Sequence, residues 1–191
     1  MTGNKRQPGF SLIEMLVVAL IFGIMSITIS QIFVSFNRLH RRVSDSAVLG
    51  QDMRFAMELI IREARNDAMD YSAAVLNKDT VLKMVKQNGQ HIWIAKQSGA
   101  NCDATVTSCL ALSLDSGTTW TQITSSRVQV QNFDVYVRPT VSPFQLVGNS
   151  YPNNAQPMAT IHLNLLYKST SVKDQVSLEA QTTVSSRVYQ R

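Results

Sequence analysis

The sequence contains few of the residues from which catalytic and metal sites are usually built. Histidine occurs only three times in 191 residues, at His40, His91 and His162, and none of these has a second ligand at metal-binding spacing. A glycine-rich phosphate loop and a nucleophile elbow are also missing. These absences disfavour an enzyme, and they give no reason to expect a cofactor or a metal.

Two short polar stretches resemble site motifs only superficially. Asp67, Asp70 and Asp79 do not follow the spacing of an EF-hand loop, so we interpret them as solvated charges. The stretch DSGTTW, residues 115–120, places a serine beside an aspartate but is more typical of a turn.

Ionisable side chains are absent from Met15 to Asn37, and Leu12–Phe36 is mostly apolar. Because a bilayer core needs about 20 such residues, this run predicts a transmembrane helix. Glu14 lies near its start. A carboxylate inside a spanning helix costs at least ~2.5 kcal/mol and is a functional candidate. At headgroup depth it would cost little, and position alone does not decide between the two.

The segment Met1–Gly9 is short, carries two basic residues and ends in Gln-Pro-Gly before the apolar run. The sequence GFSLIEMLVVALIFG that begins at Gly9 closely resembles the N-terminus of type IV pilins and type II pseudopilins. The resemblance implies that a prepilin peptidase removes Met1–Gly9 and methylates the new N-terminus at Phe10. Glu14 would then be the fifth residue of the mature chain, as the family requires.

The same resemblance implies the partners of the chain. Pilin helices pack side by side in a filament core, where Glu14 of an incoming subunit pairs with the amino group of Phe10 of a neighbour. The expected partners are other pilins or pseudopilins, the prepilin peptidase and an inner-membrane assembly platform. The chain would cross the inner membrane once, with its head outside the cytoplasm.

The charge balance gives little information about further partners. The net charge is +5, and removal of Lys5 and Arg6 with the leader lowers it to +3. Such a mild excess does not by itself predict nucleic-acid binding, so that partner stays open.

Cys102 and Cys109 are the two cysteines of the chain. In an exported domain, which the resemblance implies, an even number of cysteines at short spacing favours a disulfide. The alternative is a pair of unpaired buried thiols. A zinc site is disfavoured because no histidine lies near them.

Residues 10–71 are predicted to form one long helix, because no proline occurs between Phe10 and Tyr71. We expect it to end near Asp70, with Gly50 as a weak point. Beyond residue 38, apolar side chains recur at helical spacing and predict a stripe that packs on a sheet. The stripe consists of Leu39, Val43, Ala47, Gly50, Met53, Met57, Ile60, Ala64 and Ala68.

After Tyr71 the apolar period changes to two, which predicts strands. The expected strands are Val81–Lys86, Gln90–Lys96, Leu110–Leu114, Thr119–Ile123, Val128–Arg138, Ala159–Tyr167 and Gln175–Val184. The sequence QNG at 87–89 predicts a hairpin turn. Val130 and Phe133 lie in opposite phases of one strand, which predicts a bulge near Asn132.

Together these patterns predict an α+β fold, with a long N-terminal helix packed on an antiparallel β-sheet head. The expected division is a removable leader at 1–9, a transmembrane or filament-core helix at 10–37, its amphipathic continuation at 38–71 and a β-rich head at 72–191. Residues 140–157 are predicted to form a long surface loop.

Two further stretches resemble a subgroup of the family. Residues 52–68, DMRFAMELIIREARNDA, and residues 176–189, VSLEAQTTVSSRVY, resemble J-type pseudopilins and W-type minor pilins. The resemblance implies a structural minor subunit at the tip of a type IV pilus or type II secretion pseudopilus. One alternative is a competence or adhesion subunit whose head binds DNA or a surface through the 140–157 loop. An unrelated single-pass enzyme is a third, disfavoured hypothesis.

Overall fold

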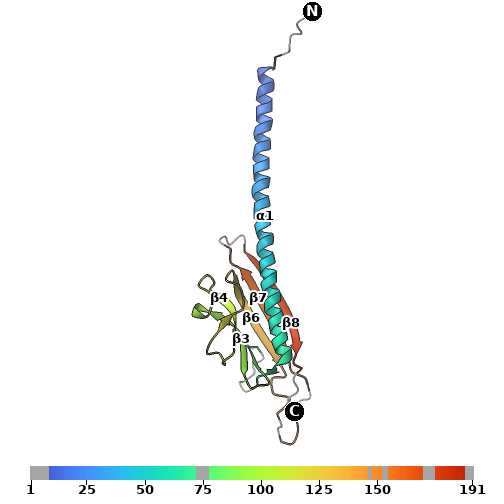
Figure 1. Cartoon of the computed structure of the whole chain (residues 1–191). Coiled ribbons are helices and arrows are strands. Elements are labelled where there is room, and N and C mark those ends of the chain that lie inside the picture. The colour runs from blue at the N-terminus through green and yellow to red at the C-terminus, as the bar shows by residue number, and fades with distance from the viewer. Residues whose placement is uncertain (1–8, 72–77, 146–147, 152–154, 170–174, 188–191) are drawn as a thin grey trace, which may run out of the picture. The chain divides into compact units, whose positions relative to one another are not determined.

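The computed structural model describes residues 9–71, 78–145, 148–151, 155–169 and 175–187. The chain divides into two compact units, Met1–Val43 and Ser44–Arg191. The helix α1, Leu12–Asn66, contributes to both units (Figure 1). Most of the predicted leader, residues 1–8, lies outside the described residues, as do parts of the predicted 140–157 loop.

Helix α1 continues without a break through Gly50, so the expected weak point does not interrupt it. It ends at Asn66 rather than near Asp70, because the next residues join a sheet. Ala68–Met69 form the short strand β1, in which Ala68 pairs with Val85 and Met69 with Met84. Long-range pairing therefore overrides the local helical pattern at this end.

The end of α1 is tied to the C-terminal segment by two hydrogen bonds. The backbone N–H of Arg187 donates to the carbonyl of Arg65 at 3.0 Å, and the Ser186 hydroxyl donates to the carbonyl of Asp67 at 2.8 Å. Carbonyls at a helix C-terminus lack intrahelical partners, and the bond from Arg187 supplies one for Arg65.

The strands form two antiparallel sheets. Sheet A has the order β1-β2-β3-β4-β5, with β2 Val81–Val85, β3 His91–Ser98, β4 Ser108–Ser113 and β5 Thr121–Gln122. Sheet B has the order β6-β7-β8, with β6 Val128–Arg138, β7 Met158–Tyr167 and β8 Val176–Ser185. Each predicted strand is confirmed within a few residues. The sequence did not predict β1 or the short 3₁₀ helix at Gly99–Asn101.

Local features of the two sheets also follow the sequence. The register of β6 against β7 shifts between Val130 and Asn132, which confirms the predicted bulge. Between β2 and β3, the N–H of Gly89 donates to the carbonyl of Lys86 at 2.9 Å, and Gly89 has a φ of 82°. The hairpin turn at 87–89 is therefore confirmed, with glycine where a left-handed conformation is needed.

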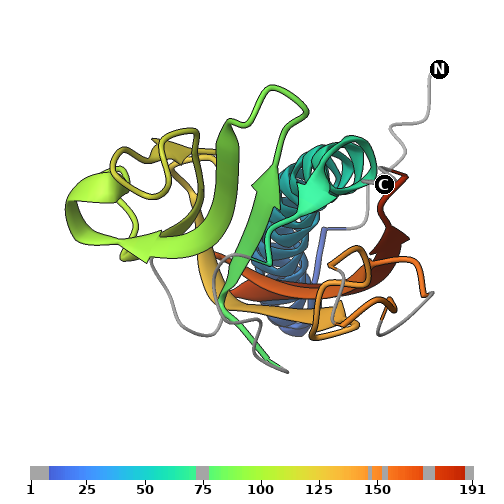
Figure 2. The ribbon, with the colours of Figure 1, turned by 90° about the horizontal axis from the view of Figure 1, so that it is seen from below.

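The head has one hydrophobic core, to which α1 and both sheets contribute. Viewed from below, the sheets lie on adjacent sides of the helix (Figure 2). The helical residues buried there are Leu49, Met53, Ala56, Met57, Ile60 and Ala64. The strands add large buried side chains such as Leu82, Ile94, Phe133 and Leu163.

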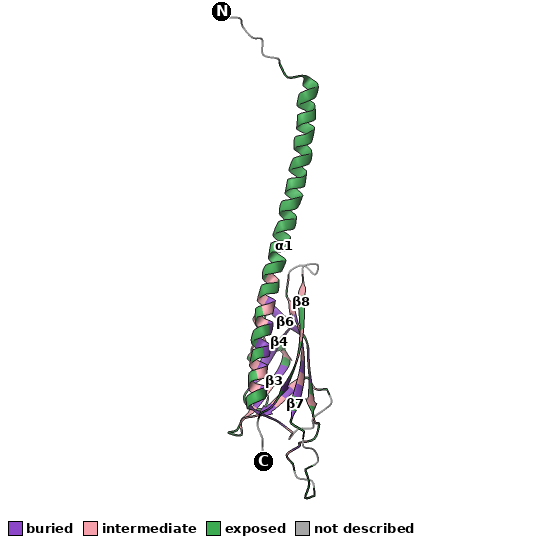
Figure 3. Ribbon diagram, turned by 90° about the vertical axis from the view of Figure 1, so that its right-hand side faces the viewer, coloured by how far each residue is buried: buried purple, intermediate pink, exposed green. Residues whose placement is uncertain are grey.

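The predicted stripe was wrong at its N-terminal end. Leu39, Val43 and Ala47 are exposed, whereas Leu49 and Ala56, which the stripe omitted, are almost fully buried (Figure 3). Helical spacing alone does not show where along a helix the head begins to cover it. Between Arg38 and Ala47 the apolar residues recur at helical spacing among charged ones, but the buried face of the helix begins only at Leu49.

The interpretation of Asp67 and Asp70 as solvated charges was also wrong, since each is only 6% exposed. Asp70 lies 3.0 Å from the imidazole Nδ1 of His91. Asp67 Oδ2 has no hydrogen-bond partner among the described residues. Burial raises the pKa of the Asp67 carboxyl, the Glu63 carboxylate raises it further, and Lys86 opposes the shift.

Asp67→Asn is expected to stabilise the head at neutral pH. A carboxyl whose pKa rises on folding favours the folded state below its ordinary pKa of 3.8, and this preference is lost as pH rises through the folded pKa. At pH 7 the buried carboxylate therefore carries a cost that an amide lacks. We expect the free energy of unfolding to rise by about 1 kcal/mol at pH 7, with no gain at pH 3.

Thermal unfolding of the full chain in detergent at both pH values measures this effect. Asp134→Asn is the control, because Asp134 pairs with Lys78 at 3.0 Å and its replacement should not stabilise. A loss of stability at pH 7 for Asp67→Asn would mean that its carboxylate has a favourable partner.

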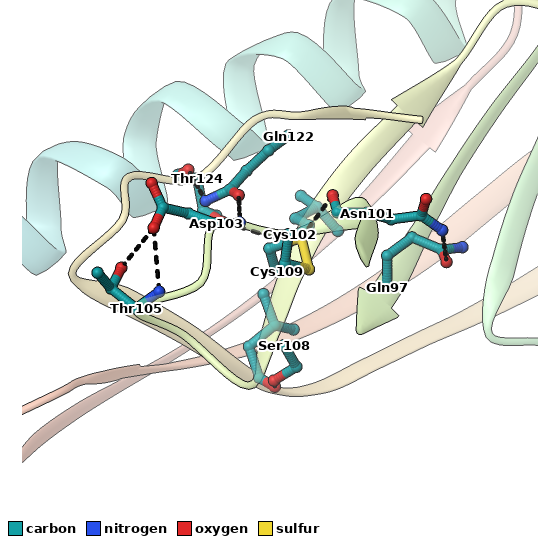
Figure 4. The surroundings of a disulfide bond; sticks show 11 residues. Gln97, Asn101, Cys102, Asp103, Thr105, Ser108, Cys109, Gln122 and Thr124 are labelled. Atoms are coloured by element: carbon teal, nitrogen blue, oxygen red, sulfur yellow. Dashed lines mark hydrogen bonds between the residues drawn. A yellow bond between two sulfur atoms is a disulfide. The ribbon is translucent and has the colours of Figure 1, made fainter. Parts of the chain in front are cut away.

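Cys102 and Cys109 form a disulfide with a Cα–Cα distance of 5.7 Å, which confirms the predicted pair (Figure 4). Cys109 and its neighbours Val106 and Ala111 form a small buried cluster apart from the main core. The loop that the disulfide closes is held from within, since the N–H of Thr105 donates to Asp103 Oδ1 at 3.0 Å. This bond lowers the pKa of the Asp103 carboxyl.

Replacing both cysteines with serine is expected to lower the free energy of unfolding, because the disulfide no longer restricts the unfolded chain. The expected loss is about 2.5 kcal/mol, which is modest because the closed loop is short. Non-reducing peptide mapping of the wild-type chain should show the two cysteine peptides linked. Two thiols that can be alkylated in protein purified without reductant would contradict the disulfide.

Candidate functional site

The N-terminal segment is the candidate site, and it begins with an exposed junction. Gly9 and Phe10 precede α1, and Phe10 is 74% exposed. A Cβ placed on Gly9 would meet no atom within 4 Å. The fold therefore does not require glycine there, so a requirement for glycine would come from an enzyme that acts on the junction.

Glu14 lies in the first turn of α1. The carbonyl of Ser11 accepts the N–H of Glu14 at 3.0 Å and that of Met15 at 3.2 Å, which makes Ser11 the N-cap residue. Serine at the N-cap and glutamate three residues later is the capping-box pattern, which sequence reasoning missed. A carboxylate here also faces the positive end of the helix dipole. The position of Glu14 in the first turn therefore favours the start of the helix, in addition to any role in assembly.

The first part of α1 is apolar and uncovered. It contains an 18-residue window with a mean hydropathy of 2.5, none of which is buried. Large side chains such as Phe22, Ile29, Phe33 and Phe36 are each more than 60% exposed. A surface of this kind on all sides of a helix needs an apolar environment, which can be lipid or other helices.

The hydroxyl groups in this part of α1 are satisfied within the helix. Ser26 donates to the carbonyl of Phe22, Ser30 to that of Ser26 and Thr28 to that of Met25, each at 2.8 Å. No hydroxyl among these three needs water, which suits an environment without water.

The histidines do not form a common site. His40 is exposed on α1, His91 pairs with Asp70, and His162 contacts Glu179 across β7 and β8. Within the part of the chain that the structure describes, no three His, Cys, Asp or Glu residues are placed to hold a metal ion.

The stretch at 115–120 is a turn, as predicted. Asp115 accepts hydrogen bonds from the hydroxyl groups of Ser113 and Thr119, at 2.7 and 2.5 Å. The bond from Thr119 is the main reason why the pKa of Asp115 falls to about 2. Gly117 lies so close to the ring of Trp93 that a Cβ would come within 2.9 Å of it. The polar groups in this turn are used to shape the loop.

A comparison with protein families finds a match at residues 4–30, which contain the Gly9-Phe10 junction and Glu14. The chain carries the prokaryotic N-terminal methylation motif. This motif is the signature of type IV pilins and pseudopilins, so the resemblance predicted from the sequence is confirmed. No curated protein and no solved structure matches the chain.

The motif supports a type IV pilin-like or pseudopilin precursor. It implies cleavage by a prepilin peptidase and assembly with other pilins. The motif and the apolar helix fit anchoring in the inner membrane and incorporation into a filament. A pilin-family motif indicates a structural subunit, which is usually not an enzyme.

Mass spectrometry of the wild-type chain extracted from membranes should show a chain that begins at methylated Phe10. Gly9→Val should leave a full-length precursor in the membrane, because the apolar helix is unchanged and a Cβ at Gly9 disturbs nothing in the fold. Gln7→Val is the matched control and should still be cleaved. An intact Met1 start for the wild-type chain in cells that have a prepilin peptidase would overturn the assignment.

Proposed function

We propose that this chain is a minor pilin or pseudopilin subunit. It is inserted in the inner membrane, cleaved after Gly9, methylated at Phe10 and assembled into a type IV pilus or type II secretion pseudopilus. The observation that carries this proposal is the methylation motif at residues 4–30, which includes the start of an apolar helix that no described residue covers.

The proposal gives Glu14 a role beyond capping. In a filament core with little water, an unpaired carboxylate is costly, and so is the amino terminus of a neighbour. Pairing the two offsets both costs, and it sets the axial position of the incoming subunit. Glu14 lies in the first turn of α1 and Phe10 lies just before the helix, so the two charges of the motif are close to one end of the helix.

The subgroup remains a proposal that rests on the resemblance of residues 52–68 and 176–189. These stretches are adjacent in the structure, where Ser186 binds the carbonyl of Asp67 and Arg187 that of Arg65. The two stretches thus meet at the end of α1, which supports treating them as one pattern. We place the subunit at the filament tip on this resemblance. The 140–157 loop lies partly outside the described residues, and no observation favours ligand binding there.

Substitutions at Glu14 separate assembly from capping. Glu14→Ala removes both the charge and the side-chain acceptor, whereas Glu14→Gln keeps a capping side chain and removes the charge. If the charge pairs with a neighbour, both variants should be inserted and cleaved normally. In both, the filament-associated share should fall about tenfold, which corresponds to about 1.4 kcal/mol.

The measurement is the ratio of filament-associated to membrane-resident protein at matched expression. Ser11→Ala is the control, because it weakens the cap and keeps the carboxylate. A normal ratio for Glu14→Gln together with a reduced ratio for Ser11→Ala would show that capping, and not charge, is the role of Glu14.

A further inference from the structure

Strand β8 forms one edge of sheet B and is long and regular. It pairs with β7 at ten consecutive positions, from Val176 opposite Tyr167 to Ser185 opposite Met158, without a register shift. No other described segment pairs with it. An edge of this length offers a row of backbone donors and acceptors to any extended chain that approaches it.

The opposite edge of sheet B is protected. Asp79 and Val135 exchange two backbone hydrogen bonds of 2.8 Å along β6. The Ser108 hydroxyl donates to the carbonyl of Val130, and the Lys96 ammonium donates to that of Gln131, both at 2.6 Å. In sheet A the edge strands β1 and β5 have two residues each, too short to offer a long edge. Among the described strands, β8 alone presents a long open edge.

The register shows which backbone groups of β8 are open. The N–H of Ser186 donates to the carbonyl of Pro157 at 3.0 Å, so this pair is of the hydrogen-bonded kind. Such pairs alternate with non-bonded pairs in an antiparallel ladder, and the residues of the latter point their N–H and C=O away from β7. The residues of β8 with outward-pointing backbone groups are therefore Ser177, Glu179, Gln181, Thr183 and Ser185.

One side-chain contact supports this assignment. The hydroxyls of Thr160 and Thr183 lie 2.9 Å apart. Side chains approach most closely in non-bonded pairs, which is where the register places Thr183 opposite Thr160.

The side chains of β8 do not block an approaching strand. Its sequence, VSLEAQTTVS, has no lysine, arginine, proline or glycine, the residues with which edge strands usually prevent pairing. Its one charge, Glu179, contacts His162 within the sheet. On the core side, Leu178 is 38% exposed, and no described strand lies beside β8 on its open edge.

We propose that β8 binds an extended segment of a different polypeptide, which adds a fourth strand to sheet B. The chemistry of the edge defines that segment. Its backbone pairs with the five outward-pointing residues, its core-side positions are apolar to cover Leu178, and its outer positions are polar or basic beside Glu179.

A second copy of this chain does not fit the edge in a membrane by antiparallel pairing. Within the head, α1 and β8 run in the same direction, and Ser186 at the end of β8 binds Asp67 after the end of α1 (Figure 1). Antiparallel pairing of β8 with β8 would reverse the helix of one copy relative to the other. Two copies that leave one membrane through α1 have their helices pointing the same way. This exclusion rests on the membrane anchoring in the proposed function.

Residue-resolved hydrogen exchange of the full chain tests the proposal. In chains purified in detergent, the amides of Glu179, Gln181 and Thr183 should exchange rapidly, and those of Ala180 and Thr182 slowly. In the native membranes of the host, with partner proteins present, exchange at the first three should slow at least 100-fold. Rapid exchange at Glu179, Gln181 and Thr183 in membranes overturns the proposal. Slow exchange at all five of these amides in purified chains overturns it as well.

A proline pair tests the same edge by substitution. Gln181→Pro removes an outward N–H and should leave the head folded, but it should abolish the protection of Glu179 and Thr183 in membranes. Ala180→Pro removes an N–H bonded to β7 and should unfold sheet B.

If purified chains form dimers that Gln181→Pro dissociates, a second copy is the occupant and the proposal is wrong. If the chain is cleaved but the edge of β8 is unprotected, this inference is wrong and the proposed function stands. If the chain is not cleaved, only the proposed function is wrong.

Discussion

The first part of α1 has an apolar surface that no other described part of the chain covers, and this constraint governs the rest of the molecule. Its exposed leucine, isoleucine, valine and phenylalanine side chains must be removed from water by lipid or by other helices. The same requirement explains why three of its hydroxyls bond to their own backbone and why ionisable groups are missing from Met15 to Asn37. A chain of this kind needs lipid or partner helices around the first part of its helix.

The head is built on the continuation of the same helix. Leu49 begins the buried face, and from there to Ala64 the helix supplies the core for both sheets. The C-terminal segment returns to the end of α1, where Arg187 bonds to the carbonyl of Arg65 and Ser186 to that of Asp67 just after the helix. One helix therefore has an apolar first part that needs lipid or other helices and a later buried face that packs on the sheets of the head. A change in the head that loosens this packing would leave the membrane surface unaltered.

The sequence allowed good predictions wherever the determining physics is local. Alternation predicted the strands, and the phase change between Val130 and Phe133 predicted the bulge. The motif around Gly9 and Glu14 was recognised because it is contiguous. Predictions failed where burial depends on distant segments. The periodicity of α1 did not show that its buried face begins at Leu49, and nothing near Asp67 indicated that the C-terminal segment would bury it. The capping box at Ser11 was a local pattern that was overlooked.

In the proposed function, Glu14 joins one subunit to the amino terminus of the next. A cryo-electron-microscopy structure of the assembled filament that resolves this chain and its neighbour would test this pairing. We expect the Glu14 carboxylate to lie within about 4 Å of the terminal nitrogen of an adjacent subunit, the range of an ion pair. A carboxylate that faces only its own helix terminus, with the neighbouring nitrogen elsewhere, would contradict it.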